Sequence, residues 1–172
     1  MKDQYFVLIS GLPNLGKSDY AKTYLHHNNS PLIIIDENDI YEDLVKYRTE
    51  LKKGKDAESI VINELRDNKK ETESYIINCM NTKIHKELSY GNNVIAVYSG
   101  LSFRERGYIM NNISDIKCDK SLVFFHMLRK KYMEYNRKLS NPLSENEINK
   151  LFSSIDMPDN KYIEGFDRVF VQ

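Results

Sequence analysis

The sequence has few cysteines, no excess charge of either sign and no long hydrophobic run, and each of these shortages excludes a class of protein. The two cysteines, Cys79 and Cys118, lack the close spacing of metal-ligand pairs, so we expect buried free thiols and neither a zinc site nor a disulfide. Lys plus Arg and Asp plus Glu number 25 each, which excludes a uniformly basic protein that coats nucleic acid. Any contact with nucleic acid must therefore be local.

No apolar stretch approaches the length of a membrane span, and the early apolar run at residues 5–10 is short enough to be a buried strand. No signal peptide precedes that run, so we expect a cytoplasmic protein without membrane contact. The composition, with 41% hydrophobic and 29% charged residues, is that of a globular domain. Without a repeat, low-complexity tract or linker in the chain, we expect one domain over residues 1–172.

What the sequence does contain is a glycine-bearing loop between a predicted strand and a predicted helix. After the apolar run, Gly11, Gly16, Lys17 and Ser18 match G-x-x-x-x-G-K-[ST], the pattern of a phosphate-binding loop (P-loop). Glycine lets the backbone curl so that several N–H groups face a polyphosphate, and the helix that begins at Lys17 adds free amides and its dipole. Lys17 supplies a mobile charge for the β- and γ-phosphates, and the Ser18 hydroxyl suits Mg²⁺. We therefore expect ATP and Mg²⁺ to bind, with nucleotide contacts from Gly11, Leu12, Pro13, Asn14, Leu15, Gly16, Lys17, Ser18 and Asp19.

Strand and helix patterns alternate along the rest of the chain. Short β-branched or apolar runs predict further strands at 32–35, 94–98, 121–125 and 168–171. Apolar residues at helical spacing predict helices over 40–53, 60–65, 76–88, 102–112, 129–138 and 144–152. Such alternation is typical of a parallel sheet of about five strands with helices on both faces, joined by right-handed crossovers. With the loop, it indicates an α/β, three-layer P-loop NTPase fold.

An acidic segment, Asp36-Glu37-Asn38-Asp39, follows the second predicted strand at its carboxyl end, where parallel sheets bind ligands. Asp39 is placed to act as a general base that accepts the proton of an acceptor hydroxyl during in-line phosphoryl transfer. It is an equally good N-cap for the next helix, with Glu42 as the capping-box acid. Asp36 is the second candidate, as the base or as an acid that joins Ser18 in holding Mg²⁺ through water.

Basic residues gather at two later places on the same predicted edge. The helix predicted at 129–138 places several lysines and an arginine beside an apolar stripe, which indicates a lid over about 127–155 or, alternatively, a solvated helix face. Arg104 and Arg106 begin the helix after the third strand. They are suited to bind an acceptor phosphate bidentately, and a surface helix start explains them equally well.

One expected residue is missing. A nucleotide-hydrolysing machine of this fold ends its third strand in an acid that helps to hold Mg²⁺, but this strand ends in Tyr98-Ser99-Gly100. Motor-type ATPase chemistry is therefore disfavoured. A small protein with a predicted lid points instead to phosphoryl transfer onto a hydroxyl.

With these residues in view, the chain resembles the P-loop kinase family typified by the kinase domain of phage polynucleotide 5′-kinase, from about residue 5 to the end. Residues 38–41 are similar to the family's Asp-Asp-x-Arg, and residues 94–106 to its strand, Asp-Thr-Asn and arginine-rich helix. Residues 134–138 are similar to its lid helix with Arg-Asn-x-x-Arg, and residues 157–169 to its closing Pro…Glu-x-Phe-Asp-x-Val segment, a wall near the adenine. The resemblance implies catalytic roles for Lys17, Asp39 and Arg137, and it makes a virus or phage one candidate source.

The chain departs from the family in the half of the site that holds the acceptor. The arginine after the general base is Tyr41 here, and the Asp of Asp-Thr-Asn is Tyr98. The two lid arginines fall on Tyr135 and Leu139, which leaves Arg137 and Lys138 as the nearest substitutes. Such tyrosines either stack on a base or sugar, or pack within the fold. The candidate substrate residues are Tyr41, Tyr98, Arg106 and Lys138.

The leading hypothesis is an ATP-dependent kinase that transfers the γ-phosphate to a hydroxyl of a nucleic acid, foremost a polynucleotide 5′-hydroxyl at a single-stranded end. The neutral charge and the missing lid arginines favour a second hypothesis, a small-molecule kinase for a nucleoside, nucleotide or antibiotic. The lost acids and arginines also permit a third, a catalytically degenerate module that only binds a nucleoside triphosphate.

Overall fold

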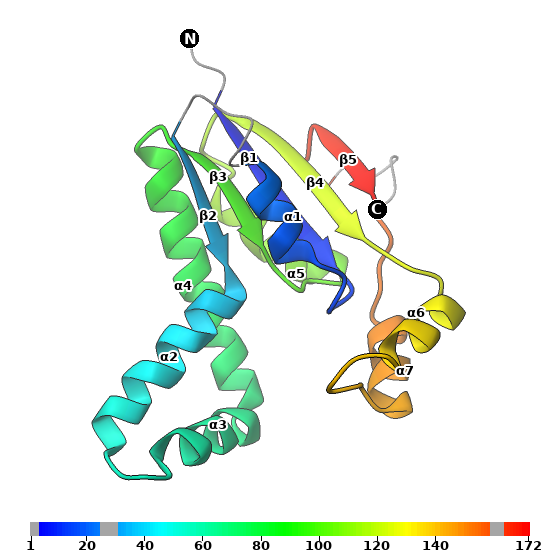
Figure 1. Ribbon diagram of the computed structural model, residues 1–172. Helices are drawn as coiled ribbons and strands as arrows, with labels where there is room; N and C mark the ends of the chain where they lie inside the picture. Colours follow the sequence, from blue (N-terminus) through cyan, green and yellow to red (C-terminus); the bar gives the residue numbers. More distant parts are fainter. Residues whose placement is uncertain (1–3, 25–30, 159–163) are drawn as a thin grey trace.

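A parallel sheet of five strands lies at the centre of the molecule (Figure 1). The computed structural model describes residues 4–24, 31–158 and 164–172. The strands are β1 (Tyr5–Gly11), β2 (Leu32–Asp36), β3 (Asn93–Val97), β4 (Asp119–Phe125) and β5 (Arg168–Val171). They pair in the order β2-β3-β1-β4-β5 and run parallel throughout, which confirms the predicted α/β P-loop NTPase fold. Because β1 is central, the loop that follows it lies in the middle of the carboxyl edge.

The two faces of the sheet are apolar and are covered by different helices. Alternate residues of β1 point to opposite faces, so Phe6 and Leu8 join one buried cluster while Val7 and Ile9 join the other. The helices are α1 (Lys17–Thr23), α2 (Glu37–Lys52), α3 (Ala57–Asp67), α4 (Lys69–Ser89), α5 (Phe103–Asn112), α6 (Arg129–Asn136) and α7 (Glu145–Ser153). Helix α1 packs on the Val7 face, and α4 and α5 pack on the Phe6 face (Figure 1). These are the three predicted layers.

Two helical projections extend beyond the carboxyl edge of the sheet (Figure 1). One consists of α2, α3 and the first part of α4, with a small core of Leu44, Val45, Val61 and Leu65 between α2 and α3. The other consists of α6 and α7, which follow β4, and α7 begins at the predicted capping box of Ser144 and Glu147. The loop after β1 lies between the two projections. A helical pair thus occupies the predicted lid region, and the α2–α3 projection stands opposite it.

Arg106 lies in the core and not on the edge where the sequence analysis placed it. Its side chain is 0% exposed and donates through Nε and Nη2 to the carboxylate of Glu164, with a Nε–Oε2 distance of 2.7 Å. Nη1 donates to the Leu101 carbonyl at 2.8 Å and Nη2 to the Asp156 carbonyl at 2.9 Å. The guanidinium also lies 5.1 Å from the centre of the Phe124 ring. The prediction that Arg106 binds substrate is therefore corrected: it ties later segments to α5.

This ion pair leads to a stability prediction. Arg106→Met keeps an unbranched apolar stem but leaves the Glu164 side chain, which is 6% exposed, without its counter-ion. Because an uncompensated buried charge is costly, we expect the free energy of unfolding to fall by about 3 kcal/mol. Urea denaturation would measure the loss, with Arg104→Met, an exposed arginine of the same helix, as the control. Equal unfolding midpoints for the two variants would contradict the structural role of Arg106.

Candidate functional site

The loop between β1 and α1 has the geometry of a phosphate-binding loop. Helix α1 begins at Lys17, as predicted, and β1 ends at Gly11, one residue beyond the predicted strand. Gly11 has a φ of 113°, and a Cβ at this position would lie 2.1 Å from the carbonyl oxygen of Phe125, so only glycine fits where the end of β1 pairs with β4. Gly16 and Asn14 are also left-handed, with φ of 77° and 60°. These turns give the loop its curl.

A cavity of about 260 Å³ lies against this loop. Six of the predicted nucleotide-binding residues line it, namely Pro13, Asn14, Gly16, Lys17, Ser18 and Asp19. Leu12 is fully buried in the core and Leu15 packs against it, so the side chains of these two anchor the loop. The opposite side of the cavity is formed by Glu37, Asn38 and Ser99. The carboxyl ends of β2 and β3 thus meet the loop around one space.

The Lys17 side chain is buried under the loop, with 8% of its surface exposed. Its Nζ donates to the carbonyls of Gly11 at 3.0 Å and Leu12 at 2.8 Å. Burial lowers the pKa of this ammonium group, and the nearby carboxylates of Glu37 and Asp36 oppose that shift. A desolvated cation held beside a cavity of this kind is suited to attract a polyphosphate.

Glu37 is the acid that the structure places opposite the loop, and the sequence analysis did not single it out. It is the first residue of α2, it lines the cavity with Lys17, and it accepts a hydrogen bond from the Ser99 hydroxyl at 3.0 Å. Burial raises the pKa of its carboxyl group, although Ser99 and Lys17 pull the pKa the other way. The only signal in the sequence was its place in the acidic run after the second strand.

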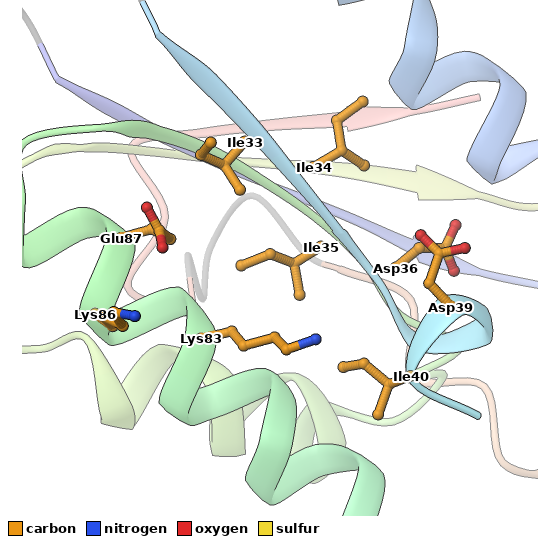
Figure 2. Close-up of a pocket in the computed structure, with 9 residues that line it drawn as sticks. All are labelled: Ile33, Ile34, Ile35, Asp36, Asp39, Ile40, Lys83, Lys86 and Glu87. Carbon is orange, nitrogen blue, oxygen red and sulfur yellow. The ribbon is translucent and has the colours of Figure 1, made fainter. Parts of the chain in front are cut away.

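Asp36 and Asp39 lie beside this cavity rather than in its lining. Asp36 is buried and caps α2 by accepting from the Asn38 amide at 2.9 Å, so the cap is Asp36, and the capping role predicted for Asp39 is wrong. Both acids line a neighbouring cavity of about 300 Å³ between β2 and α4. Figure 2 shows their carboxylates at the end of β2, with Lys83 across the cavity on α4. Asp39 is exposed there, and its role as general base stays a prediction.

The residues around the cavity are suited to bind Mg²⁺ together with phosphate oxygens. The Ser18 hydroxyl and the Glu37 carboxylate are oxygen donors on opposite sides of it. Among the described residues, no cluster of three or more His, Cys, Asp or Glu could hold a metal ion without further ligands. An arrangement with so few protein ligands is compatible with Mg²⁺, because this ion keeps several waters and uses substrate phosphates as ligands.

Tyr98 faces a third cavity, of about 530 Å³, on the other side of the loop that follows β3. Burial raises the pKa of its phenol, with the Glu105 carboxylate acting in the same direction. The same cavity is lined by Lys70 and by Arg104, whose Nε donates to the Tyr108 hydroxyl at 2.9 Å. Two cations, two tyrosine rings and the carboxylates of Glu73 and Glu105 therefore share this space.

Three other predicted site residues lie elsewhere. Tyr41 packs against the small core between α2 and α3 and lines a separate cavity there. Arg137 and Lys138, after the end of α6, are exposed, and Arg137 lines a shallow pocket formed by α6 itself. The structure thus brings the loop, Lys17 and Ser18 together with Glu37, and leaves these three residues outside that group.

Solved structures with a similar fold include kinases. The chain is similar to a gluconokinase from Sinorhizobium meliloti 1021, with 11% identity over 99% of this chain and 83% of that one and a TM-score of 0.61. It is similar to Chaetomium thermophilum Kti12 in complex with ADP-AlF3, with 11% identity, coverage of 97% and 88%, and a TM-score of 0.64. A chain of the Pnkp1/Rnl/Hen1 RNA repair complex shows 14% identity, coverage of 97% and 47%, and a TM-score of 0.61.

No protein-family model and no curated protein matches the sequence. At these low identities the likeness establishes the fold, and the chemistry has to be argued from the site. Among the described residues, no helix combines the length and the hydrophobicity that crossing a membrane requires.

Proposed function

We propose that the protein is an ATP-dependent kinase that transfers the γ-phosphate to an alcohol, with a nucleic-acid 5′-hydroxyl as the leading acceptor. One observation carries this proposal: the P-loop, with Lys17 and Ser18, faces the Glu37 carboxylate across a single cavity. A cation, a hydroxyl and a carboxylate around one polyphosphate-sized space are the groups that phosphoryl transfer to an alcohol requires. The likeness of the fold to that of a gluconokinase supports the same reaction class.

Each of these groups has a role in the proposed reaction. Backbone amides of the loop bind the β-phosphate, and the Lys17 ammonium offsets the charge that develops on the oxygens of the transferring group. The Ser18 hydroxyl would hold Mg²⁺, which would supply further charge compensation. The acceptor oxygen attacks the γ-phosphorus while the bond to the β–γ bridging oxygen breaks, and ADP leaves.

Glu37 is the strongest candidate for the general base that receives the proton of the acceptor hydroxyl. It lines the phosphate cavity, and its carboxyl pKa is raised by burial, which makes its carboxylate a better proton acceptor than an exposed glutamate. Asp39 remains the alternative, in line with the family resemblance. It would serve if the acceptor hydroxyl entered from the neighbouring cavity that Asp39 lines.

The cavity around Tyr98 is the space that we assign to the acceptor. Tyr98 and Tyr108 offer rings for stacking, and Lys70 and Arg104 offer cations for phosphates. Rings and cations side by side suit the end of a single strand of nucleic acid, because bases stack on aromatic side chains and phosphates pair with cations. Tyr98, which lines it, directly precedes Ser99 in the chain, and the Ser99 hydroxyl donates to the proposed base.

A small hydroxylated acceptor, such as a nucleoside, nucleotide or antibiotic, is the second candidate. The observation that favours it is the placement of the basic residues: Arg106 is buried in an ion pair, and Arg137 and Lys138 lie away from the phosphate cavity. Fewer cations then remain to hold the phosphates of a long strand.

A transfer assay separates these candidates. Labelled ATP with Mg²⁺ and a 5′-hydroxyl oligonucleotide should yield labelled oligonucleotide, and a panel of nucleosides and aminoglycoside-type alcohols tests the small-molecule reading. Label on a small molecule alone would replace the leading acceptor by the second. ATP binding without transfer to any acceptor would leave a degenerate nucleotide-binding module.

The acceptor cavity leads to a kinetic prediction. Arg104→Met removes one cation from it and should raise the KM for a 5′-hydroxyl oligonucleotide about tenfold, because one charged hydrogen bond to phosphate is lost. The KM for ATP should stay within about twofold of wild type. Arg66→Met, on the exposed side of α3, is the matched control. An unchanged oligonucleotide KM in the Arg104 variant would place the acceptor elsewhere.

A further inference from the structure

Most carbonyl groups of the P-loop accept hydrogen bonds from other parts of the protein, and four of them accept from side chains. The carbonyls of Gly11 and Leu12 accept from the Lys17 ammonium, and the carbonyl of Gly16 accepts from the Tyr20 amide at 2.9 Å. Between them, the carbonyls of Pro13 and Asn14 also have donors, and these come from a distant part of the chain.

Those donors are two tyrosines of α6. The Tyr132 hydroxyl donates to the Pro13 carbonyl at 3.3 Å, and the Tyr135 hydroxyl donates to the Asn14 carbonyl at 2.7 Å. Tyr132 is 0% exposed, and Tyr135 lies on the surface at 37% exposure. The two residues are three apart, so they lie on one side of the helix and reach successive carbonyls of the loop.

The direction of a carbonyl fixes the direction of the next amide, because a trans peptide group is planar and its C=O and N–H point opposite ways. Turning the carbonyls of Pro13 and Asn14 towards α6 therefore turns the amides of Asn14 and Leu15 away from it. Pro13 and Asn14 line the phosphate cavity, whereas none of the described residues of α6 does. The amides of Asn14 and Leu15 therefore point to the side of the cavity, where they would meet a phosphate.

We propose that Tyr132 and Tyr135 are positioning residues: their hydroxyls fix the Pro13 and Asn14 carbonyls so that the following amides are pre-set to bind the phosphates of a nucleotide. The inference rests on the nucleotide binding in the proposed function but does not depend on the acceptor. Asn14 is left-handed, with a φ of 60°, a conformation that asparagine tolerates better than most non-glycine residues, and the Tyr135 contact fixes the direction of its carbonyl.

Helix α6 is itself held firmly enough to act as this support. The Tyr132 ring packs edge-on against Phe152 of α7, with ring centres 5.6 Å apart. The buried Asn136 side chain bonds both backbone groups of Leu143, at 2.8 and 2.9 Å, which closes the turn between α6 and α7. The α6–α7 pair therefore braces the loop as one unit, so the lid region is coupled to the phosphate site before any nucleotide arrives.

The test removes the hydroxyls and keeps the rings. Tyr132→Phe, Tyr135→Phe and the double variant of the full chain would be titrated calorimetrically with ADP, with inorganic tripolyphosphate and with adenosine. We expect ADP and tripolyphosphate to bind about fivefold more weakly to Tyr135→Phe and about tenfold or more to the double variant, because each loses neutral hydrogen bonds that order the amides. Adenosine, which has no phosphates, should bind as to wild type. Amide resonances of Asn14 and Leu15 should shift in the nucleotide-free double variant.

Tyr90→Phe, a 71% exposed tyrosine at the end of α4, is the matched control and should change none of these values. Wild-type ADP and tripolyphosphate affinity in the double variant would overturn the inference and leave the proposed function intact. An equal loss for adenosine would also overturn it, since that would indicate general damage to the fold. A wild-type protein that binds neither ADP nor tripolyphosphate would overturn the proposed function as well.

Discussion

Lys17→Ala should lower kcat/KM for phosphoryl transfer on the order of a thousandfold, the effect expected when a pre-placed charge on the transition state is lost. The reason lies in its surroundings: the ammonium is 8% exposed, so its charge is poorly screened, and it lies beside the cavity that would hold the phosphates. Its removal also leaves the Gly11 and Leu12 carbonyls without their donor. Single-turnover assays with saturating acceptor would measure the loss.

A neighbouring lysine provides the control for this variant. Lys22 lies on the same helix, with its side chain 67% exposed in an ion pair with Asp19. Lys22→Ala should keep near-wild-type turnover, because an exposed ion pair contributes little to stability. If Lys17→Ala retained half of the wild-type activity while folding normally, the loop would not be the phosphate site.

Glu37→Gln should lower kcat about a thousandfold and leave the affinity for ATP nearly unchanged, as expected when a general base is removed. Glutamine keeps the shape of the side chain and can still accept from Ser99, so the loop of β3 should stay in place. Asp39→Asn is the matched comparison, because it removes the carboxylate that the sequence favoured. A large loss in Asp39→Asn with little loss in Glu37→Gln would return the base to Asp39.

The dependence of kcat/KM on pH gives Glu37 a second signature. Its carboxyl pKa is raised by burial, and only the deprotonated form can act as a base, so activity should rise with pH through that raised pKa. The acid limb should therefore lie at a higher pH than for an exposed glutamate, and Glu37→Gln should lose that limb. An acid limb that survives the substitution would show that another group controls it.

The fold and the phosphate loop could be predicted because their signals are local. Alternating apolar runs and helical stripes report secondary structure over a few residues, and a P-loop is a continuous segment whose glycines and lysine have fixed spacing. Every predicted strand and helix is present, with most ends displaced by a few residues, although α4 begins at Lys69, seven residues before the predicted start. The prediction that Asp39 caps the second helix failed because the start of that helix was misplaced. Helix α2 begins at Glu37, not at residue 40, so the cap passes to Asp36.

The sequence by itself therefore determined the α/β fold, the position of the anion-binding loop and the group of acids that faces it. Only the tertiary structure decided which acid does so: Glu37 and Asp39 are two positions apart on α2, about 200° around a helix of 3.6 residues per turn, and so they face different cavities. It also decided that Arg106 is buried, because its partner Glu164 lies 58 residues further along the chain. The tyrosines of α6 contact loop residues that lie 119 and 121 positions away in the sequence. Contacts between segments so far apart leave no periodic pattern in a single sequence, since they depend on how the chain packs in three dimensions.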